Sequence, residues 1–578
     1  MIEKLITPVL HNIPLFFASI LLLGGFDVFY HQYIFHENTL LAMLLAYGEM
    51  ILMGCLACVT AWSLRKFHIK PLIYIVLFTV YAVNCYLRYA YSTDISPKIL
   101  LLLFETNSKE ISGFFKTYFL TPAMYKTVFV VSGILLMTCI GEMIREKIGR
   151  LIAKTPFSQL LSTLLIIGAI GGIHPVSRYT RLALCSNTFE AERWLMETPY
   201  RKGMPLPNLF YSLDAIRMSG KDLEYMIAST EAALQNVGCE QTDSLNIVLV
   251  IGESFNKYHS SLYGYSLDTT PSQREEQAKG NLCAFTHVKA PHNMTSIVLR
   301  NVLCTNNVHE GEYWYNYPYF PAIFKKAGYD VWFWDNQYKW DPDAPWAFTL
   351  NSVIFNERIQ QLSYSAINKH GYTYDDGLIT DFEKKQKDSL GVRNLIVFHL
   401  AGQHWPASMQ YPQDKKYQVF SPSDIKDTKP YLNDESRQRL ADYANATHYN
   451  DAVIRQIMDL VKDDNSILIY FPDHGEEIYD YRDFYGRQVL GEDLITPELI
   501  KYQIEIPFVI WCSDRWKASH PKEWEAINQS QDREFSTDNI CHLLFHLGGI
   551  RTKEYKQERD LISPRFVPQT KAYNMLSI

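Results

Sequence analysis

This sequence of 578 residues lacks an excess of positive charge, since its formal net charge is −7. Proteins that bind nucleic acids are usually basic, so nucleic acid is not an expected partner. The sequence also lacks paired CxxC motifs among its ten cysteines. One CxxC, formed by Cys55 and Cys58, lies inside an apolar segment, where packing is favoured over zinc or redox chemistry.

A small-residue cleavage site does not follow the first apolar segment, so we do not expect a cleavable signal peptide. A chain of this length predicts at least two domains. Five apolar stretches predict transmembrane helices, at residues 10–30, 40–62, 71–91, 128–144 and 160–173. The first three are long enough to cross a hydrocarbon core of about 30 Å, and the last is short and rich in glycine.

The short loops predict how these helices are oriented. Loops 64–70 and 145–154 carry several lysines and arginines, whereas the loop at 30–38 carries none. Positive loops stay in the cytoplasm, so the N-terminus is expected inside and everything beyond about residue 172 outside. The predicted domains are a transmembrane domain of five helices at 1–174, a bridging helix and linker at 175–243, and an external domain at 244–578. Residues 94–123 are expected to lie near the membrane interface.

The external domain alternates short apolar strands with helical patterns, which predicts βαβ units and a mostly parallel sheet. The expected strands are residues 247–251, 329–334, 394–400, 466–471 and 507–511. Polar residues follow the ends of several of these strands, where open α/β sheets bind their ligands. Glu253 follows the first strand, and Asp473 and His474 follow the fourth. Two buried strands that each deliver metal-ligand residues predict one shared metal site, although Glu253 alone also fits the first turn of a capped helix.

Two further residues fit chemistry at this site. Thr295 opens a helical pattern, where a hydroxyl is most often an N-cap. The start of a helix also attracts phosphate, and a metal held by Glu253, Asp473 and His474 would activate the hydroxyl as a nucleophile. His404 follows a buried strand and is expected to contact the leaving group, although a lone histidine is more often a surface or packing residue.

The order of several motifs resembles the membrane-anchored phosphoethanolamine transferases, which are sulfatase-like members of the alkaline phosphatase superfamily. The similar motifs are Gly252-Glu253-Ser254, Tyr263-Gly264-Tyr265, Thr269-Thr270-Pro271, Thr295, the H-x-x-G-x-H pattern ending at His404, Tyr443 to Ala446 with Tyr449-Asn450-Asp451, and Asp473-His474-Gly475-Glu476-Glu477. The resemblance covers the whole chain. It implies five N-terminal spans and an α/β/α sandwich as the external catalytic domain.

The resemblance also implies roles for individual residues. Glu253, Thr295, Asp473 and His474 would bind a catalytic Zn²⁺, and Thr295 would carry the transferred group. The residues expected on the substrate side are His404, Asn336, Asn107 and Glu110. The family commonly has a further histidine about a dozen residues after the DHGEE motif, and here Arg487 stands in that region. An arginine binds phosphate but not a metal, so one zinc is expected and a second is in doubt.

The resemblance implies a monomeric multi-pass protein of the bacterial inner membrane with a periplasmic catalytic domain. It would move phosphoethanolamine from phosphatidylethanolamine to an envelope glycolipid, either the lipid A or the core sugars of lipopolysaccharide, or to another glycan. The alternatives are a phosphodiesterase or a phosphoglycerol transferase on the same scaffold, and a receptor without activity. A sulfatase activity is not expected, because no C/S-x-P-x-R context surrounds Thr295.

Overall fold

The computed structural model describes residues 2–26, 28, 40–91, 94–95, 99–100, 121–153, 157–182, 184, 204–337, 353–487 and 496–568. The chain divides into two compact units, Met1–Lys221 and Asp222–Ile578. Helix α11 (Pro205–Ala233) contributes to both units. The finer division of the chain at residues 174 and 243 stays a prediction.

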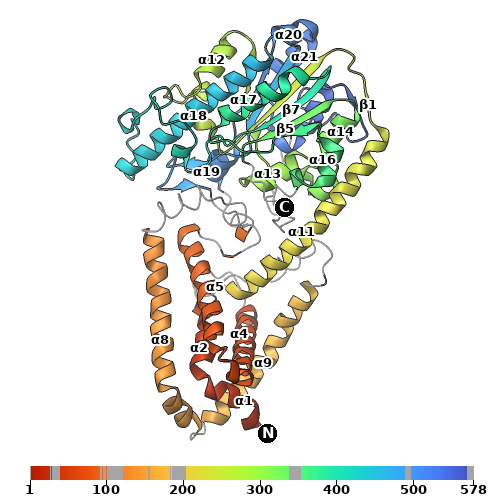
Figure 1. The fold of residues 1–578 in the computed structure, drawn as a ribbon. Helices are drawn as coiled ribbons and strands as arrows, with labels where there is room; N and C mark the ends of the chain where they lie inside the picture. The colour runs from red at the N-terminus through yellow and green to blue at the C-terminus, as the bar shows by residue number, and fades with distance from the viewer. Residues whose placement is uncertain are drawn as a thin grey trace. The chain divides into compact units, whose positions relative to one another are not determined.

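The first unit is helical (Figure 1). Its helices are α1 (Ile2–His11), α2 (Ile13–Leu22), α4 (Leu40–Ser63), α5 (Lys70–Tyr91), α8 (Pro122–Ala153) and α9 (Phe157–Leu182). Among the described residues, three segments are long and apolar enough to cross a membrane: Met43–Ser63, Lys70–Ala90 and Pro122–Arg150. The helices at the other two predicted spans carry only shorter apolar stretches, Ile13–Leu22 and Ser162–Ile173. The first predicted span is interrupted at Asn12, where α2 begins with a proline in its first turn.

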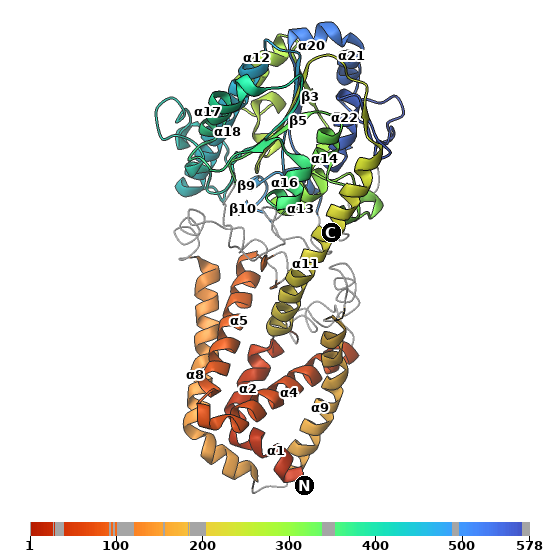
Figure 2. The same ribbon diagram turned by 45° about the vertical axis from the view of Figure 1, so that its right-hand side comes forward.

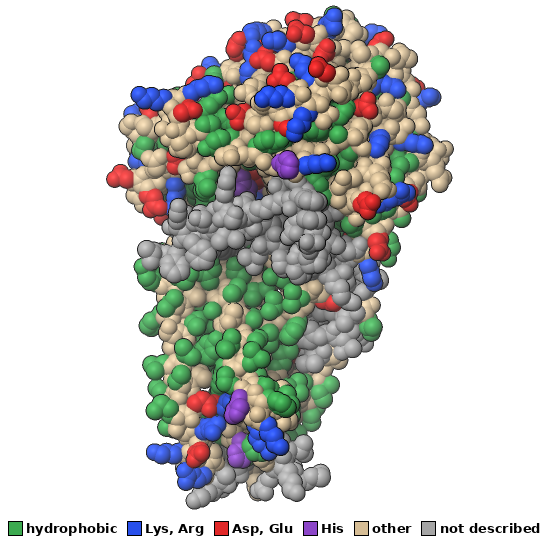
Figure 3. Space-filling model, in the orientation of Figure 1, with side chains coloured by type: hydrophobic (Ala, Val, Ile, Leu, Met, Phe, Trp, Pro, Cys, Tyr) green, Lys and Arg blue, Asp and Glu red, His purple; other side chains and the backbone are tan. Residues whose placement is uncertain are grey.

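The surface of this unit is apolar along α5 and α8, as the green area in the lower part of Figure 3 shows. Phe129 and Met143 on α8 are 81% and 85% exposed, and Leu72 and Ile75 on α5 are also exposed. Large apolar side chains exposed to water in such numbers would be costly. Their exposure therefore fits helices that face lipid.

Helices α4 and α9 approach each other closely. An added Cβ at Gly172 would clash with the backbone carbonyl of Gly48, and one at Gly168 would lie 2.6 Å from Ile51 Cδ1. Small residues allow the backbones of membrane helices to come this near, which strengthens their van der Waals packing. Gly168 and Gly172, two of the glycines that weaken the apolar pattern of the last predicted span, therefore serve helix packing.

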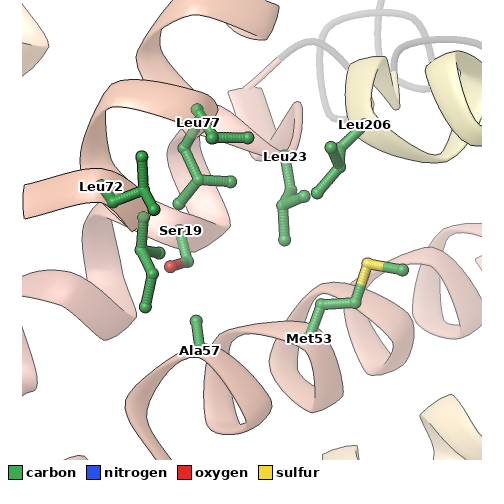
Figure 4. Close-up of a pocket in the computed structure, with 9 residues that line it drawn as sticks. Ser19, Leu23, Met53, Ala57, Leu72, Leu77 and Leu206 are labelled. Atoms are coloured by element: carbon green, nitrogen blue, oxygen red, sulfur yellow. The ribbon is translucent and has the colours of Figure 1, made fainter. Parts of the chain in front are cut away.

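An apolar cavity of about 280 Å³ lies within this unit (Figure 4). The hydroxyl of Ser19 is the polar side-chain group in its lining, and it donates a hydrogen bond of 2.7 Å to the carbonyl of Leu15. The other lining residues are apolar: Leu23, Met53, Ala57, Leu72, Ile73, Val76, Leu77 and Leu206. With its one hydroxyl satisfied internally, this cavity offers no group for catalysis.

The second unit is built on a seven-stranded sheet in the order β3-β11-β8-β2-β7-β5-β6. Its strands are β2 (Leu245–Gly252), β3 (Leu282–Phe285), β5 (Asp330–Asp335), β6 (Ala366–Ile367), β7 (Arg393–His399), β8 (Ser466–Pro472) and β11 (Phe508–Cys512). All pairs from β8 to β6 are parallel, and β11 is antiparallel to both neighbours. The five predicted strands and the mostly parallel sheet are thus confirmed. The edge strands β3 and β6 were not predicted.

Helices cover both faces of this sheet (Figures 1 and 2). Alternate residues of β2 point to opposite faces, as expected for a strand. Ile247, Leu249 and Ile251 pack with α13 (Thr295–Val302), α14 (Phe320–Lys326) and α22 (Ile540–Leu547). Val248 and Val250 pack with α17 (Asp375–Gln386) and α18 (Asp434–Val461). The unit is therefore the expected α/β/α sandwich, which explains why β2 reads as an unbroken apolar run.

Candidate metal and phosphoryl-transfer site

Two central strands bring the predicted metal ligands together. Strands β2 and β8 are parallel neighbours, and Gly252 pairs with Pro472 at their carboxyl ends. The next residues, Glu253 and Asp473, therefore emerge side by side. Both side chains and that of His474 are completely buried.

These three side chains form a group that can hold a metal ion. One ligand atom from each of Glu253, Asp473 and His474 lies within 4.8 Å of the others. His474 Nε2 lies 3.3 Å from Glu253 Oε1 and 3.1 Å from Asp473 Oδ2. Asp473 Oδ2 is buried without a hydrogen bond among the residues that the structure describes. Two carboxylates and an imidazole around a common point fit the ligand preferences of zinc.

Thr295 lies at the same point. It is the first residue of α13, and Met294 occupies the N-cap position. Its hydroxyl donates a hydrogen bond of 3.1 Å to Glu253 Oε2 and lies 3.3 Å from His474 Nε2. The hydroxyl therefore does not cap the helix, which was the alternative interpretation of this residue. It instead faces the group of candidate ligands, from the end of a helix that favours anions.

Neighbouring groups orient these ligands. Gln337 Nε2 donates to Glu253 Oε2 at 2.8 Å and to the carbonyl of Leu400 at 2.9 Å. The hydroxyl of Ser254 donates to Glu253 Oε1 at 2.7 Å, and its backbone amide donates to Asp473 Oδ1 at 3.1 Å. Such contacts behind metal ligands fix the direction of the ligand atoms. Gln337 was not among the residues predicted for the site, although it directly follows the predicted Asn336.

The backbone of Ser254 adopts a φ of +54°, which non-glycine residues seldom adopt. Tyr443 stabilises this turn, because its hydroxyl donates to the carbonyl of Ser254 at 2.6 Å and accepts from the amide of Asn256 at 2.8 Å. This contact gives a structural role to the tyrosine of the Tyr443 to Ala446 motif.

Arg487 also reaches the site. Its Nη1 lies 2.6 Å from His474 Nε2, and its Nε pairs with Glu476 Oε2 at 3.1 Å. Burial raises the pKa of Glu476, and Arg487 opposes that shift. Arg487, which stands where the resemblance implied a histidine, is thus brought to the metal-ligand group. Its role as a phosphate contact stays a prediction.

The other residues predicted on the substrate side lie at different places, and their contacts with substrate stay predictions. His404 lies in the loop after β7, near enough to Glu253 to lower the pKa of that carboxyl. The side chain of Asn336 donates to Asp375 at 2.8 Å and accepts from the amide of Tyr372 at 2.6 Å, so it holds two loops together. Asn107 and Glu110 lie outside the described residues.

A buried histidine beside the site was not among the selected residues. His399 Nδ1 lies 3.1 Å from Asp335 Oδ1, and both side chains are 1% exposed. Burial lowers the pKa of His399, but Asp335, together with Glu253 and Asp473, outweighs it and the net shift is upward. The first histidine of the H-x-x-G-x-H pattern was the signal for this residue.

The charges of the ligand group depend on each other. Burial alone would raise the pKa of Glu253, but the charge and hydrogen bond of His474, with His404 and Arg487, hold it well below its usual range. Burial opposes protonation of His474, but Asp473 and Glu253 raise its pKa to about 9. The site therefore stabilises a positive charge between two carboxylates, which is also what a bound cation supplies.

Comparisons with known proteins show which proteins this chain resembles. The sulfatase family profile matches residues 245–550. Phosphoethanolamine transferase EptC of Escherichia coli O18:K1:H7 (strain RS218 / NMEC) is 27% identical over 499 residues, which cover 83% of this chain and 80% of the relative. The crystal structure of the C-terminal periplasmic domain of EcEptC from Escherichia coli is 29% identical and covers 57% of this chain and 90% of that one, with a TM-score of 0.50.

A full-length relative shows the same fold over both units. The integral membrane protein lipooligosaccharide phosphoethanolamine transferase A (EptA) from Neisseria meningitidis is 17% identical, covers 96% of this chain and 98% of that one, and has a TM-score of 0.60. The resemblance to the membrane-anchored phosphoethanolamine transferases is thereby confirmed, and the chain belongs to the sulfatase family.

Proposed function

We propose that this chain transfers phosphoethanolamine from phosphatidylethanolamine to an envelope glycolipid, either the lipid A or a core sugar of lipopolysaccharide, through a covalent intermediate on Thr295. One observation carries the proposal: the Thr295 hydroxyl lies within 3.3 Å of both Glu253 and His474, at the first turn of a helix. A hydroxyl so placed is suited to nucleophilic attack on phosphorus.

Glu253, Asp473, His474 and the Thr295 oxygen would hold one zinc ion. When bound, this ion supplies the positive charge that lowers the pKa of a hydroxyl and neutralises phosphoryl oxygens. The proposal has one zinc site, because the resemblance implies a histidine where this chain has Arg487, and an arginine does not bind a metal.

In the first half-reaction the oxygen of Thr295 attacks the phosphorus of the lipid, and the bond from phosphorus to the diacylglycerol oxygen breaks. Glu253 Oε2, which accepts the hydroxyl hydrogen of Thr295 in a hydrogen bond of 3.1 Å, takes this proton as the oxygen attacks and returns it to the Thr295 oxygen in the second half-reaction. His404 protonates the departing oxygen. The guanidinium of Arg487 contacts the phosphoryl oxygens.

In the second half-reaction an acceptor oxygen attacks the same phosphorus, and the bond to Thr295 breaks. His404, now neutral, takes the proton of the acceptor. Replacing His404 by alanine therefore slows both half-reactions, because one residue serves as acid in the first and as base in the second.

The proposed function also requires a membrane topology that places the catalytic domain outside the cytoplasm. Five helices would cross the bacterial inner membrane with the N-terminus in the cytoplasm, and residues 244–578 would lie in the periplasm as a monomeric catalytic domain. The Lys/Arg-rich loops support this orientation. Asn107 and Glu110 would contact the lipid donor, and Asn336 would contribute to substrate binding.

Mass spectrometry of the purified chain, incubated with phosphatidylethanolamine, tests the proposal. A phosphoethanolamine adduct on Thr295 is expected. A glycerol phosphate adduct, formed instead when phosphatidylglycerol is supplied, would assign the chain to the alternative transferase activity.

A further inference from the structure

A second cavity lies in the catalytic unit, with a volume of about 320 Å³. Three loops line it: the one after β2, the one before α18, and the one after the short strand β9 (Glu477–Ile478). We call it the β9 pocket. Its lining combines aromatic rings with charged side chains, which is the composition of a site for a polar organic ligand.

Hydrogen bonds connect the β9 pocket to the backbone of Glu476, two residues after the candidate ligand His474. His259 Nε2 lies 3.0 Å from Asp480 Oδ1, and both residues line the pocket. Asn256 Nδ2 donates to Asp480 Oδ2 at 3.1 Å and to the carbonyl of Glu476 at 2.8 Å. His259 follows Glu253 by six residues, so its Cα lies within about 21 Å of that ligand. A glycan of a few rings bridges such a distance.

The charge of the lining argues against a phosphate ligand. Three carboxylates line the pocket, from Asp424, Asp427 and Asp480, against two lysines. The ammonium of Lys429 is paired with Asp427 at 2.7 Å, and that of Lys426 donates to the carbonyl of Ser423 at 2.7 Å. The lysines are therefore already engaged. The three carboxylates also accept hydrogen bonds within the protein, Asp424 from Ser421, Asp427 from Lys429 and Asp480 from Asn256 and the amide of Ile478. Because a carboxylate offers about four acceptor positions, each can still accept a hydrogen bond from a neutral, hydroxyl-rich ligand.

An aromatic face completes the pocket. Tyr265 is half-buried in the lining, with its ring centroid 4.8 Å from that of His259. The Nδ1 atom of His259 is buried and has no hydrogen-bond partner in the part of the chain that the structure describes. A sugar ring offers an apolar face to the tyrosine and hydroxyl groups to the histidine and the carboxylates.

We propose that the β9 pocket binds a neutral sugar ring of the acceptor glycan, beside the atom that receives phosphoethanolamine. The accepting oxygen itself lies at Thr295, outside the pocket. This proposal rests on the proposed function for the identity of the glycan, but the binding site is tested without any transfer.

The test measures binding of a dephosphorylated lipopolysaccharide core oligosaccharide to the full-length chain by titration calorimetry. Ser266, which lines the pocket and is exposed, is replaced by tryptophan to fill it. Ser389→Trp is the matched control. Ser389 is also exposed, but it precedes the amino end of β7, whereas the metal-ligand group lies at the carboxyl ends of the strands. Tyr265→Leu is a second variant, which removes the ring and keeps most of the bulk.

We expect Ser266→Trp and Tyr265→Leu to weaken binding at least tenfold, Ser389→Trp to bind like the wild type, and inorganic phosphate not to compete. Unchanged affinity in both pocket variants, no binding by the wild type, or displacement by phosphate would overturn the proposal. The Thr295 adduct, measured separately in the wild type, reports on the proposed function. If the oligosaccharide binds in the pocket but no adduct forms on Thr295, the proposed function would be refuted and the proposal for the pocket would stand.

Discussion

Gln337 provides a sharp test of how the site is organised, because it touches a candidate ligand but is not one. Its amide nitrogen donates to Glu253 Oε2 at 2.8 Å and to the carbonyl of Leu400 at 2.9 Å. Replacement by leucine keeps the size of the side chain and removes both donors. Glu253 Oε1 then still accepts the hydrogen bond from Ser254, but the orientation of the Glu253 carboxylate is less constrained.

Loss of an outer contact behind a metal ligand typically lowers metal affinity about 10–100-fold. That range corresponds to about 1.4–2.8 kcal/mol in binding free energy. It agrees with the contribution of about 1.5–3 kcal/mol for a hydrogen bond to a charged group. We therefore expect Gln337→Leu to bind zinc about 10–100-fold more weakly than the wild type, measured by competition with a chelator of known affinity.

Gln360 offers a matched control. It is half-buried in α16 (Glu357–Ser363), at the edge of the sheet, and its amide donates to the carbonyl of Phe355 at 2.8 Å. Gln360→Leu also removes a hydrogen bond to a backbone carbonyl but leaves the metal ligands untouched. Zinc affinity should therefore stay at the wild-type value in the control. Equal zinc affinity of Gln337→Leu and the wild type would refute the role assigned to Gln337.

Three further predictions concern the ligands, the membrane unit and the topology. Asp473→Ala removes a buried carboxylate from the ligand group and should abolish zinc binding and transfer together; elemental analysis showing full metal occupancy would contradict the ligand set. Gly172→Ala should destabilise the membrane unit by about 1–3 kcal/mol in thermal unfolding, because the added Cβ meets the backbone of Gly48. Gly171→Ala is the control and should leave the stability unchanged, because a Cβ added there has no atom within 4 Å. Reporter fusions should place loops 64–70 and 145–154 in the cytoplasm and residues 244–578 outside it; a cytoplasmic signal from the last segment would reverse the topology.

Much of the catalytic unit could be predicted because its strands are long apolar runs. Strands β2, β5, β7, β8 and β11 are buried on both faces, and such runs are recognisable without a structure. The edge strands β3 and β6 were not predicted, because they are too short to carry a recognisable pattern. β6 has two residues and β3 has four, so neither carries a pattern that differs from a loop.

The helices of the membrane unit were harder to predict, because a hydropathy pattern does not show where a helix is interrupted or where two helices pack closely. Residues 71–91 match α5 (Lys70–Tyr91) almost residue for residue. The stretch from 10 to 30 instead contains the break at Asn12, which depends on local backbone geometry. Gly168 and Gly172 weaken the apolar pattern of a span. The reason for them, the close approach to Ile51 and Gly48 of α4, is visible only in three dimensions.

At the site, the residues that follow strand ends were accessible to prediction. Glu253, Asp473 and His474 come together because parallel neighbours end at one edge of the sheet. Gln337 and His399 were not selected, since their roles depend on which side-chain atoms meet. Gln337 reaches Glu253 while its neighbour Asn336 turns to Asp375, a choice that sequence spacing does not reveal.

The central claim is that Thr295 carries the transferred group. The most direct measurement is intact-protein and peptide mass spectrometry of the full-length chain after exposure to phosphatidylethanolamine without acceptor, with diacylglycerol quantified in parallel. We predict a phosphoethanolamine adduct on Thr295 with stoichiometric release of diacylglycerol, and neither product in Thr295→Ala. Transfer to an acceptor by Thr295→Ala at the wild-type rate would contradict the covalent mechanism and return Thr295 to a structural role at the start of α13.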